Sequence, residues 1–138
     1  MSNSLYDKGR ESFLSQNPAI DWDTDIIKCA LVLTAYAVNL ATDQYLNPAF
    51  NTNIATNGRS AAFTAKTVTA GVADAADVTL TAVSGTQVSY IVIYKDTGTD
   101  TTSPLIAYID TATGLPFTPN GGDVTIAWDN AANRIFKL

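Results

Sequence analysis

The aspartates are the side chains of this sequence whose spacing could do chemistry. Asp21, Asp23 and Asp25 alternate with other residues as in the first part of a calcium-binding loop. An EF-hand loop also needs Gly at its sixth position and Glu at its twelfth, and Ile26 and Val32 stand there instead. The pattern therefore excludes an EF-hand. It leaves a looser calcium site or three carboxylates on a solvated loop, and we favour the solvated loop.

A second group of aspartates, Asp96, Asp100 and Asp110, surrounds one expected hairpin. Two carboxylates held about 5 to 10 Å apart in a cleft can hydrolyse a glycosidic bond. Aspartates in turns rich in Thr and Gly, however, commonly accept hydrogen bonds from nearby backbone amides. We therefore interpret these three residues as turn formers rather than as a catalytic pair.

Other catalytic groups are scarce. The chain has no histidine and a single glutamate, Glu11, so the usual general base and the Ser-His and Cys-His pairs are missing. Neither glycine-rich phosphate-binding motif, GxGxxG or GxxxxGK[ST], occurs. We expect a protein that is not an enzyme and that has no catalytic residues, no cofactor and no metal site; a small hydrolase is a remote alternative.

Three tyrosines could form a row on one face of a sheet. Tyr90 and Tyr94 share a strand face, and Tyr108 is expected near them on the adjacent strand. An exposed row could stack on sugar rings or anchor an interface. Packing inside the core is the alternative, and we favour it.

Charge and composition restrict the partners. The formal net charge is −5 with a pI near 4.3, which disfavours both nucleic acid and an anionic membrane surface as partners. Cys29 lies in an apolar run and is expected to be a buried, inert thiol. Because no signal peptide and no apolar stretch of about 20 residues is apparent, we expect a soluble protein made in a cytosol.

The expected elements are mostly strands. Residues 1–17 are predicted to be helical, with Ser4 and Asp7 as a capping box and Asn17-Pro18 as the end. Residues 42–60, rich in Asn, Pro and Gly, are predicted to be irregular. Alternating or two-faced apolar patterns predict strands at 26–34, 63–69, 78–82, 88–94, 105–109, 124–128 and 134–138.

These elements predict the fold class. About seven or eight short strands separated by turns are typical of an all-β sandwich or a jelly-roll-like barrel. No linker divides the chain, so we expect one domain over residues 1–138 with a short N-terminal helix. Residues 88–94 are apolar on both faces, which predicts a central strand covered on each side.

Parts of the sequence resemble a known group of proteins. The segments concerned are Asn3-Ser4-Leu5-Tyr6-Asp7-Lys8-Gly9-Arg10-Glu11-Ser12-Phe13-Leu14, 19–25, Ile91-Val92-Ile93-Tyr94-Lys95-Asp96-Thr97-Gly98, 103–110 and 120–128. Over these segments, which cover half to two-thirds of the chain, the sequence is similar to small virion structural proteins of tailed bacteriophages. Residues 36–62 match least.

The resemblance implies a role rather than a reaction. It implies a capsid decoration or cement protein that sits on the outer capsid surface of the virion, clamps neighbouring capsomers and is made in the host bacterial cytoplasm. Its partners would be the major capsid protein and other copies of itself, with a trimer as the expected homo-oligomer. A carbohydrate- or receptor-binding module on a tail or fibre is the alternative.

The expected contact surface is at the N-terminus. A short amphipathic helix is marginal alone and needs the domain or a neighbouring subunit to pack on. The loop 42–60 is a second candidate contact. The candidate interface residues are Leu5, Tyr6, Phe13, Leu14 and Trp22.

Overall fold

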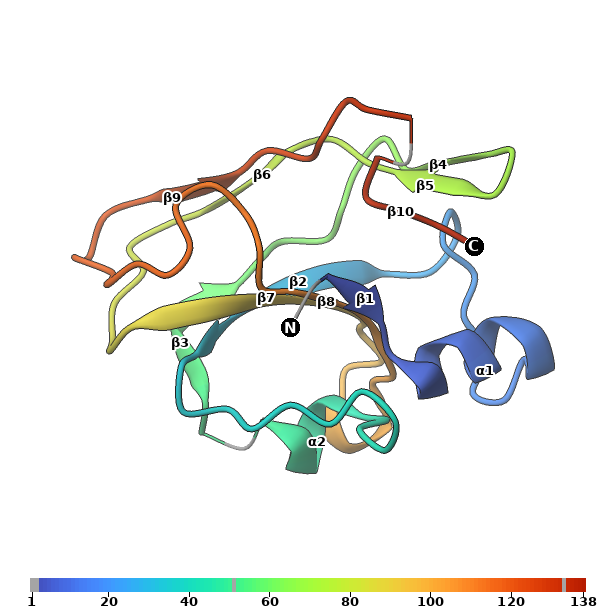
Figure 1. Ribbon diagram of the computed structural model, residues 1–138, viewed down its shortest axis with the longest axis horizontal. Helices are drawn as coiled ribbons and strands as arrows, with labels where there is room; N and C mark the ends of the chain where they lie inside the picture. The colour runs from blue at the N-terminus through green and yellow to red at the C-terminus, as the bar shows by residue number, and fades with distance from the viewer. Residues whose placement is uncertain (1–2, 51, 133) are drawn as a thin grey trace.

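A five-stranded antiparallel sheet forms the middle of the molecule. The computed structural model describes residues 3–50, 52–132 and 134–138. The sheet has the order β1–β8–β7–β2–β3 and lies between two other layers (Figure 1). Its strands are β1 (Ser4–Leu5), β8 (Leu105–Ile109), β7 (Val88–Lys95), β2 (Ile27–Leu33) and β3 (Ile54–Arg59).

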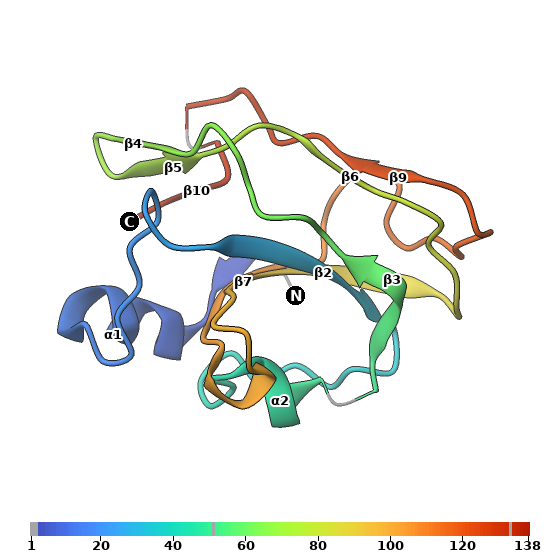
Figure 2. The same ribbon diagram turned by 180° about the vertical axis from the view of Figure 1, so that it is seen from behind.

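Two small sheets form a second layer over one face of the central sheet. Figures 1 and 2 show this layer from opposite sides, with β6 and β9 at one end and β4, β5 and β10 at the other. One sheet has the order β10–β5–β4 and the other pairs β6 with β9. The strands are β4 (Thr67–Thr69), β5 (Val72–Asp74), β6 (Val78–Leu80), β9 (Val124–Ile126) and β10 (Phe136–Lys137).

The opposite face of the central sheet is covered by short helices and loops. These include α2 (Leu46–Ala49) and the 3₁₀ helix η1 (Asp100–Thr102), while α1 (Asp7–Ser15) lies at one end of the sheet (Figure 1). Because both faces are covered, the molecule has two apolar cores. Ile91 and Ile93 of β7 enter the core between the sheets, and Val92 and Tyr94 enter the core on the helix side. The two-faced pattern of this strand is therefore confirmed.

The helix α1 packs directly on β8. A Cβ atom built on Gly9 would lie 2.8 Å from the carbonyl oxygen of Leu105 and 3.0 Å from that of Ile106. Only glycine therefore lets the helix approach the strand this closely. The helix begins at Asp7 with Tyr6 at its N-cap position, and no side chain caps it. The predicted capping box is wrong, because Ser4 belongs to β1, where it pairs with Tyr108.

The all-β class is confirmed, but the structure differs from the prediction in four details. The sheets do not close into a barrel, and the described residues form ten strands rather than seven or eight. The segment 42–60 is not irregular throughout, because it contains β3, which pairs with β2. The strand expected at 63–69 is shorter, since only Thr67–Thr69 pairs. Ala65 has a φ of 50°, which interrupts an extended strand.

Candidate functional site

Three of the five candidate interface residues are buried within the chain itself. Leu5, Tyr6 and Trp22 are 7%, 0% and 4% exposed. The hydroxyl of Tyr6 hydrogen-bonds to that of Tyr36 at 3.0 Å, and the indole N–H of Trp22 donates to the carbonyl oxygen of Asp74 at 3.0 Å. This corrects the expectation that all five side chains are offered to a partner.

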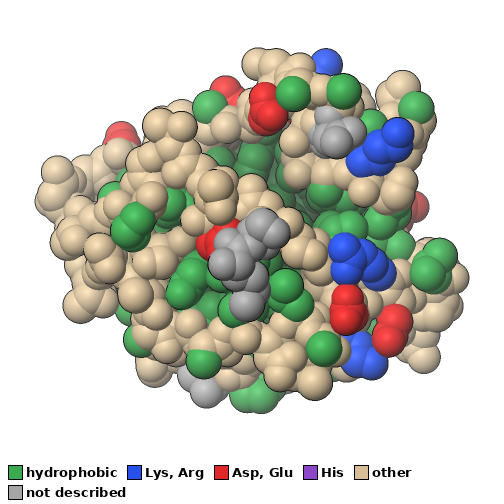
Figure 3. Space-filling view, in the orientation of Figure 1, with side chains coloured by type: hydrophobic (Ala, Val, Ile, Leu, Met, Phe, Trp, Pro, Cys, Tyr) green, Lys and Arg blue, Asp and Glu red, His purple; other side chains and the backbone are tan. Residues whose placement is uncertain are grey.

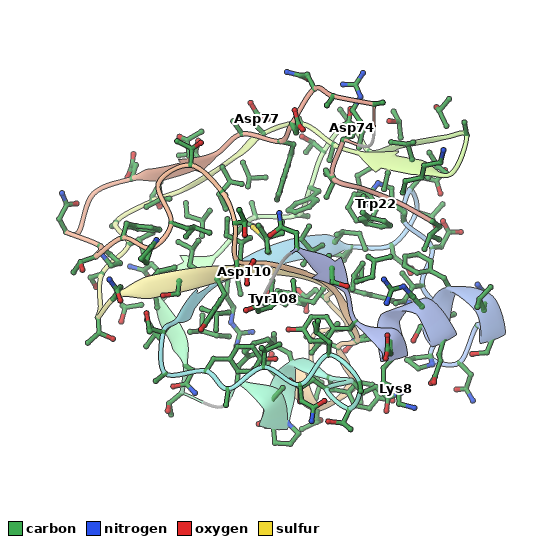
Figure 4. The ribbon with its side chains drawn as sticks, in the orientation of Figure 1. Lys8, Trp22, Asp74, Asp77, Tyr108 and Asp110 are labelled. Carbon is green, nitrogen blue, oxygen red and sulfur yellow. The ribbon has the colours of Figure 1, made fainter. Side chains whose placement is uncertain are left out.

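Of the other two candidates, Phe13 lines a recess at the end of α1, and Leu14 is exposed outside it. We name this recess, of about 380 Å³, the Phe13 opening. It lies between α1 and the β4–β5–β10 sheet, and Figure 4 shows Trp22 in the space between these two elements. Leu14 follows Phe13 on the helix. The lining residues are Phe13, Gln16, Ile20, Asp21, Trp22, Asp23, Val68, Gly71, Ala73, Phe136 and Leu138.

Exposed apolar side chains gather at this opening. Four large hydrophobic side chains of the described residues are more than half exposed, namely Leu14 (87%), Leu138 (60%), Val68 (54%) and Ile26 (53%). Two of the four, Val68 and Leu138, line the Phe13 opening, and Leu14 and Ile26 do not. Clustered exposed apolar groups mark interaction sites more often than scattered ones do.

The pairing of β4 with β5 explains why Val68 is exposed. Val68 stands directly opposite Ala73, so both side chains lie on the same face of the hairpin. Ala73 is 4% exposed and belongs to the core between the sheets. The core-facing side of the hairpin therefore extends beyond the residues that cover it, and the core is open to solvent at Val68.

The charged side chains that line the Phe13 opening are acidic. Asp21 and Asp23 are exposed and lie close enough for their carboxyl groups to share a hydrogen bond, which raises the pKa of Asp23 and lowers that of Asp21. Lys66 lowers the pKa of Asp23 slightly but donates its hydrogen bond to the carbonyl oxygen of Asp25. The ion pairs of the described residues do not include Asp21 or Asp23.

The third aspartate of this segment has a different role. Asp25 forms an ion pair of 2.9 Å with Lys95, and its carboxylate also accepts the backbone N–H of Asp21 at 2.8 Å. Among the described residues, no group of three or more His, Cys, Asp and Glu side chains is placed to hold a metal ion. Asp21 and Asp23 therefore lie exposed on the loop, whereas Asp25 is partly buried in its ion pair with Lys95.

The aspartates of the β7–β8 connection are held in structural contacts. Asp96 forms an ion pair with Lys28 at 2.6 Å and accepts the backbone N–H of Gly98 at 2.9 Å, and these contacts lower its pKa. Asp100 accepts two hydrogen bonds of 2.8 Å from Arg59, which lower its pKa. For both residues the geometry is that of turn and ion-pair chemistry rather than of a catalytic carboxylate pair.

The tyrosine row belongs to the core on the helix side of the sheet. Tyr94 and Tyr108 are each 1% exposed, and Tyr90 packs against this core. The rings of Tyr90 and Tyr108 lie 5.4 Å apart. Figure 4 shows Tyr108 below the central sheet, on the side of α2. The core interpretation is confirmed, and no flat row of three exposed rings is available to stack on a sugar.

A larger groove runs along the open side of the sandwich. A recess of about 630 Å³ lies between β1 and β8 on one side and residues 126–129 and 134–137 on the other. Figure 3 shows it as a hollow with hydrophobic side chains at its floor and Lys or Arg at its rim. Arg10 and Arg134 of this rim already form ion pairs with Asp7 (3.0 Å) and Asp74 (3.3 Å). These two arginines are therefore already paired within the chain.

The sequence matches no protein-family model and no curated protein. No helix within the described ranges combines the length and the apolar character needed to cross a bilayer. Any function assigned to the chain therefore rests on its own sequence and surface.

Proposed function

We propose that the chain is a structural protein of a bacteriophage particle. It binds the outer capsid surface and stabilises the shell by clamping neighbouring capsomers, and it is not an enzyme. The observation that carries the proposal is the Phe13 opening, where the domain leaves Val68 and Leu138 exposed together beside Phe13. The sequence resemblance described above supports the same role.

The rigidity of the domain suits a clamp. The central sheet is covered on both faces, and its middle strands β2 and β7 pair along seven residue positions. Among the described residues, no buried side-chain nitrogen or oxygen lacks a hydrogen-bond partner. A domain with filled cores and satisfied polar groups transmits force between its contact surfaces without deforming.

Mass action explains how such binding would stabilise a shell. A protein that binds only the assembled shell lowers the free energy of that state and so opposes disassembly. Many copies around symmetry axes raise the effective concentration, so each contact can be modest. The partners are the major capsid protein and other copies of this chain, for which we propose a trimer.

Co-sedimentation with shells tests the proposal. Shells assembled from the major capsid protein without this chain are mixed with the purified protein and pelleted, and their disruption temperature is measured. We expect the chain to pellet with the shells and to raise the disruption temperature, while an unrelated acidic β-protein of similar size does neither. Absence of the chain from the pellet would contradict the proposal.

The alternative, a carbohydrate- or receptor-binding module of a tail or fibre, has less support. This alternative required an exposed row formed by Tyr90, Tyr94 and Tyr108. The rings of Tyr94 and Tyr108 are instead fully buried. We therefore retain the capsid role as the proposal.

A further inference from the structure

The Phe13 opening has two features that together indicate which side chains a partner would place in it. Its floor and edge are apolar, with Phe136 and Ile20 inside and Val68 and Leu138 exposed. The charged side chains that line it are the acids Asp21 and Asp23. An apolar side chain entering the recess would gain from burial, and a cation beside it would meet two carboxylates.

The two carboxylates favour a cation from outside the chain. Asp21 and Asp23 lie side by side at the surface and take part in none of the ion pairs of the described residues. The pKa of Asp23 is raised first by its hydrogen bond with the Asp21 carboxyl group and then by repulsion between the two negative charges. A Lys or Arg placed between them would remove that repulsion, and Arg could bond both carboxylates in its planar geometry.

A second copy of this chain fits the opening poorly. Six of the eight Lys and Arg side chains already form ion pairs within the chain, and Lys66 is bonded to the carbonyl oxygen of Asp25. Few cations therefore remain to offer to another copy's Asp21 and Asp23. The net charge of −5 also opposes self-association through an acidic rim. Contacts between copies would lie elsewhere on the surface.

We propose that the Phe13 opening docks a segment of the shell protein that presents an apolar side chain next to a Lys or Arg. The apolar side chain lies among Val68, Phe136 and Leu138, and the cation lies on Asp21 and Asp23. This inference deepens the proposed function and rests on it for the identity of the partner.

Binding of variants to shells assembled without the chain tests the inference. Val68→Ser removes an exposed apolar group that lines the opening, and the double variant Asp21→Asn with Asp23→Asn removes the charge. Ile26→Ser is the matched control, because Ile26 is as exposed as Val68 but does not line the opening. Circular dichroism and urea unfolding establish that each variant is folded, which is expected because the substituted side chains are exposed.

We expect Val68→Ser and the double Asn variant each to bind shells ~10-fold more weakly, as for a residue at the centre of an interface. The double variant should also lose most of the salt dependence of binding, and Ile26→Ser should bind like the wild type. If wild-type protein does not bind shells, the proposed function fails. If it binds and the opening variants bind equally well, the function stands and the inference is overturned.

Two further results would overturn the inference while leaving the function intact. One is tighter shell binding by the double Asn variant, because it would mean an acidic partner. The other is wild-type self-association in sedimentation equilibrium that Val68→Ser abolishes, because it would mean that a second copy occupies the opening.

Discussion

Replacement of Gly9 by alanine tests how closely the helix α1 packs on the central sheet. In an exposed helix interior, alanine in place of glycine stabilises a protein by about 1 kcal/mol. Here the added Cβ would lie 2.8 Å from the carbonyl oxygen of Leu105, and that oxygen belongs to a strand of the central sheet. Because the backbone of a paired strand cannot move aside freely, overpacking should cost about 2–3 kcal/mol, the upper part of the usual range, which outweighs the helix preference.

We therefore expect Gly9→Ala to lower the free energy of unfolding by about 1–2 kcal/mol. Equilibrium urea unfolding followed by tryptophan fluorescence measures the change. Ser15→Ala is the control, because Ser15 lies in the same helix with its side chain exposed, and it should change stability by no more than about 0.5 kcal/mol. A Gly9→Ala protein as stable as the wild type, or more stable, would refute the close packing of α1 on β8.

Three further predictions concern buried and paired groups. Burial raises the pKa of Cys29 to about 12, so we expect Ellman's reagent to modify this thiol only after unfolding, and fast reaction of the native protein would contradict the structure. Tyr36→Phe removes the hydroxyl that bonds to Tyr6 and Asp43, and should cost about 1–3 kcal/mol in urea unfolding; an unchanged midpoint would show that the buried hydroxyl contacts are absent. The Lys28 contact lowers the pKa of Asp96, so this ion pair stabilises the fold above the ordinary aspartate pKa and is lost as pH falls through the lowered value. Lys28→Met should therefore lose less stability than the wild type between about pH 5 and pH 2, and parallel pH profiles would contradict this.

The central strands could be predicted from the sequence because their burial leaves a regular pattern. Residues 88–94 are apolar on both faces, and β7 is buried between two cores. The predicted strand 105–109 coincides with β8. Local sequence is informative here because every position of a covered strand is apolar or small.

The strand β3 could not be predicted because its turn-like residues form a bulge. Asn57-Gly58 is typical of a tight turn, and Asn57 does have a positive φ of 57°. The pairing with β2 nevertheless continues past it, from Ala30 opposite Arg59 to Val32 opposite Ile54. Extra residues in one strand of a pair are a β-bulge, and turn chemistry alone does not distinguish it from a loop.

The candidate site could be predicted only in part. Phe13 was identified from the short helix and does line the opening, whereas Leu14 is exposed on the helix and does not line it. Tyr6 was misplaced, because it was expected on a helix face and instead lies at the N-cap position beneath the sheet. Val68 was missed, because its exposure depends on how far the β4–β5 hairpin extends beyond the core, and this is a property of the tertiary arrangement.

The position of the chain in the virion is tested most directly by an averaged cryo-electron microscopy map of the phage particle. The proposal predicts density with the shape of this sandwich on the outer face of the capsid, with the end of α1 and the β4–β5 hairpin against the shell. Density of this shape on the tail or a fibre, or a particle in which the chain is absent by mass spectrometry, would contradict it.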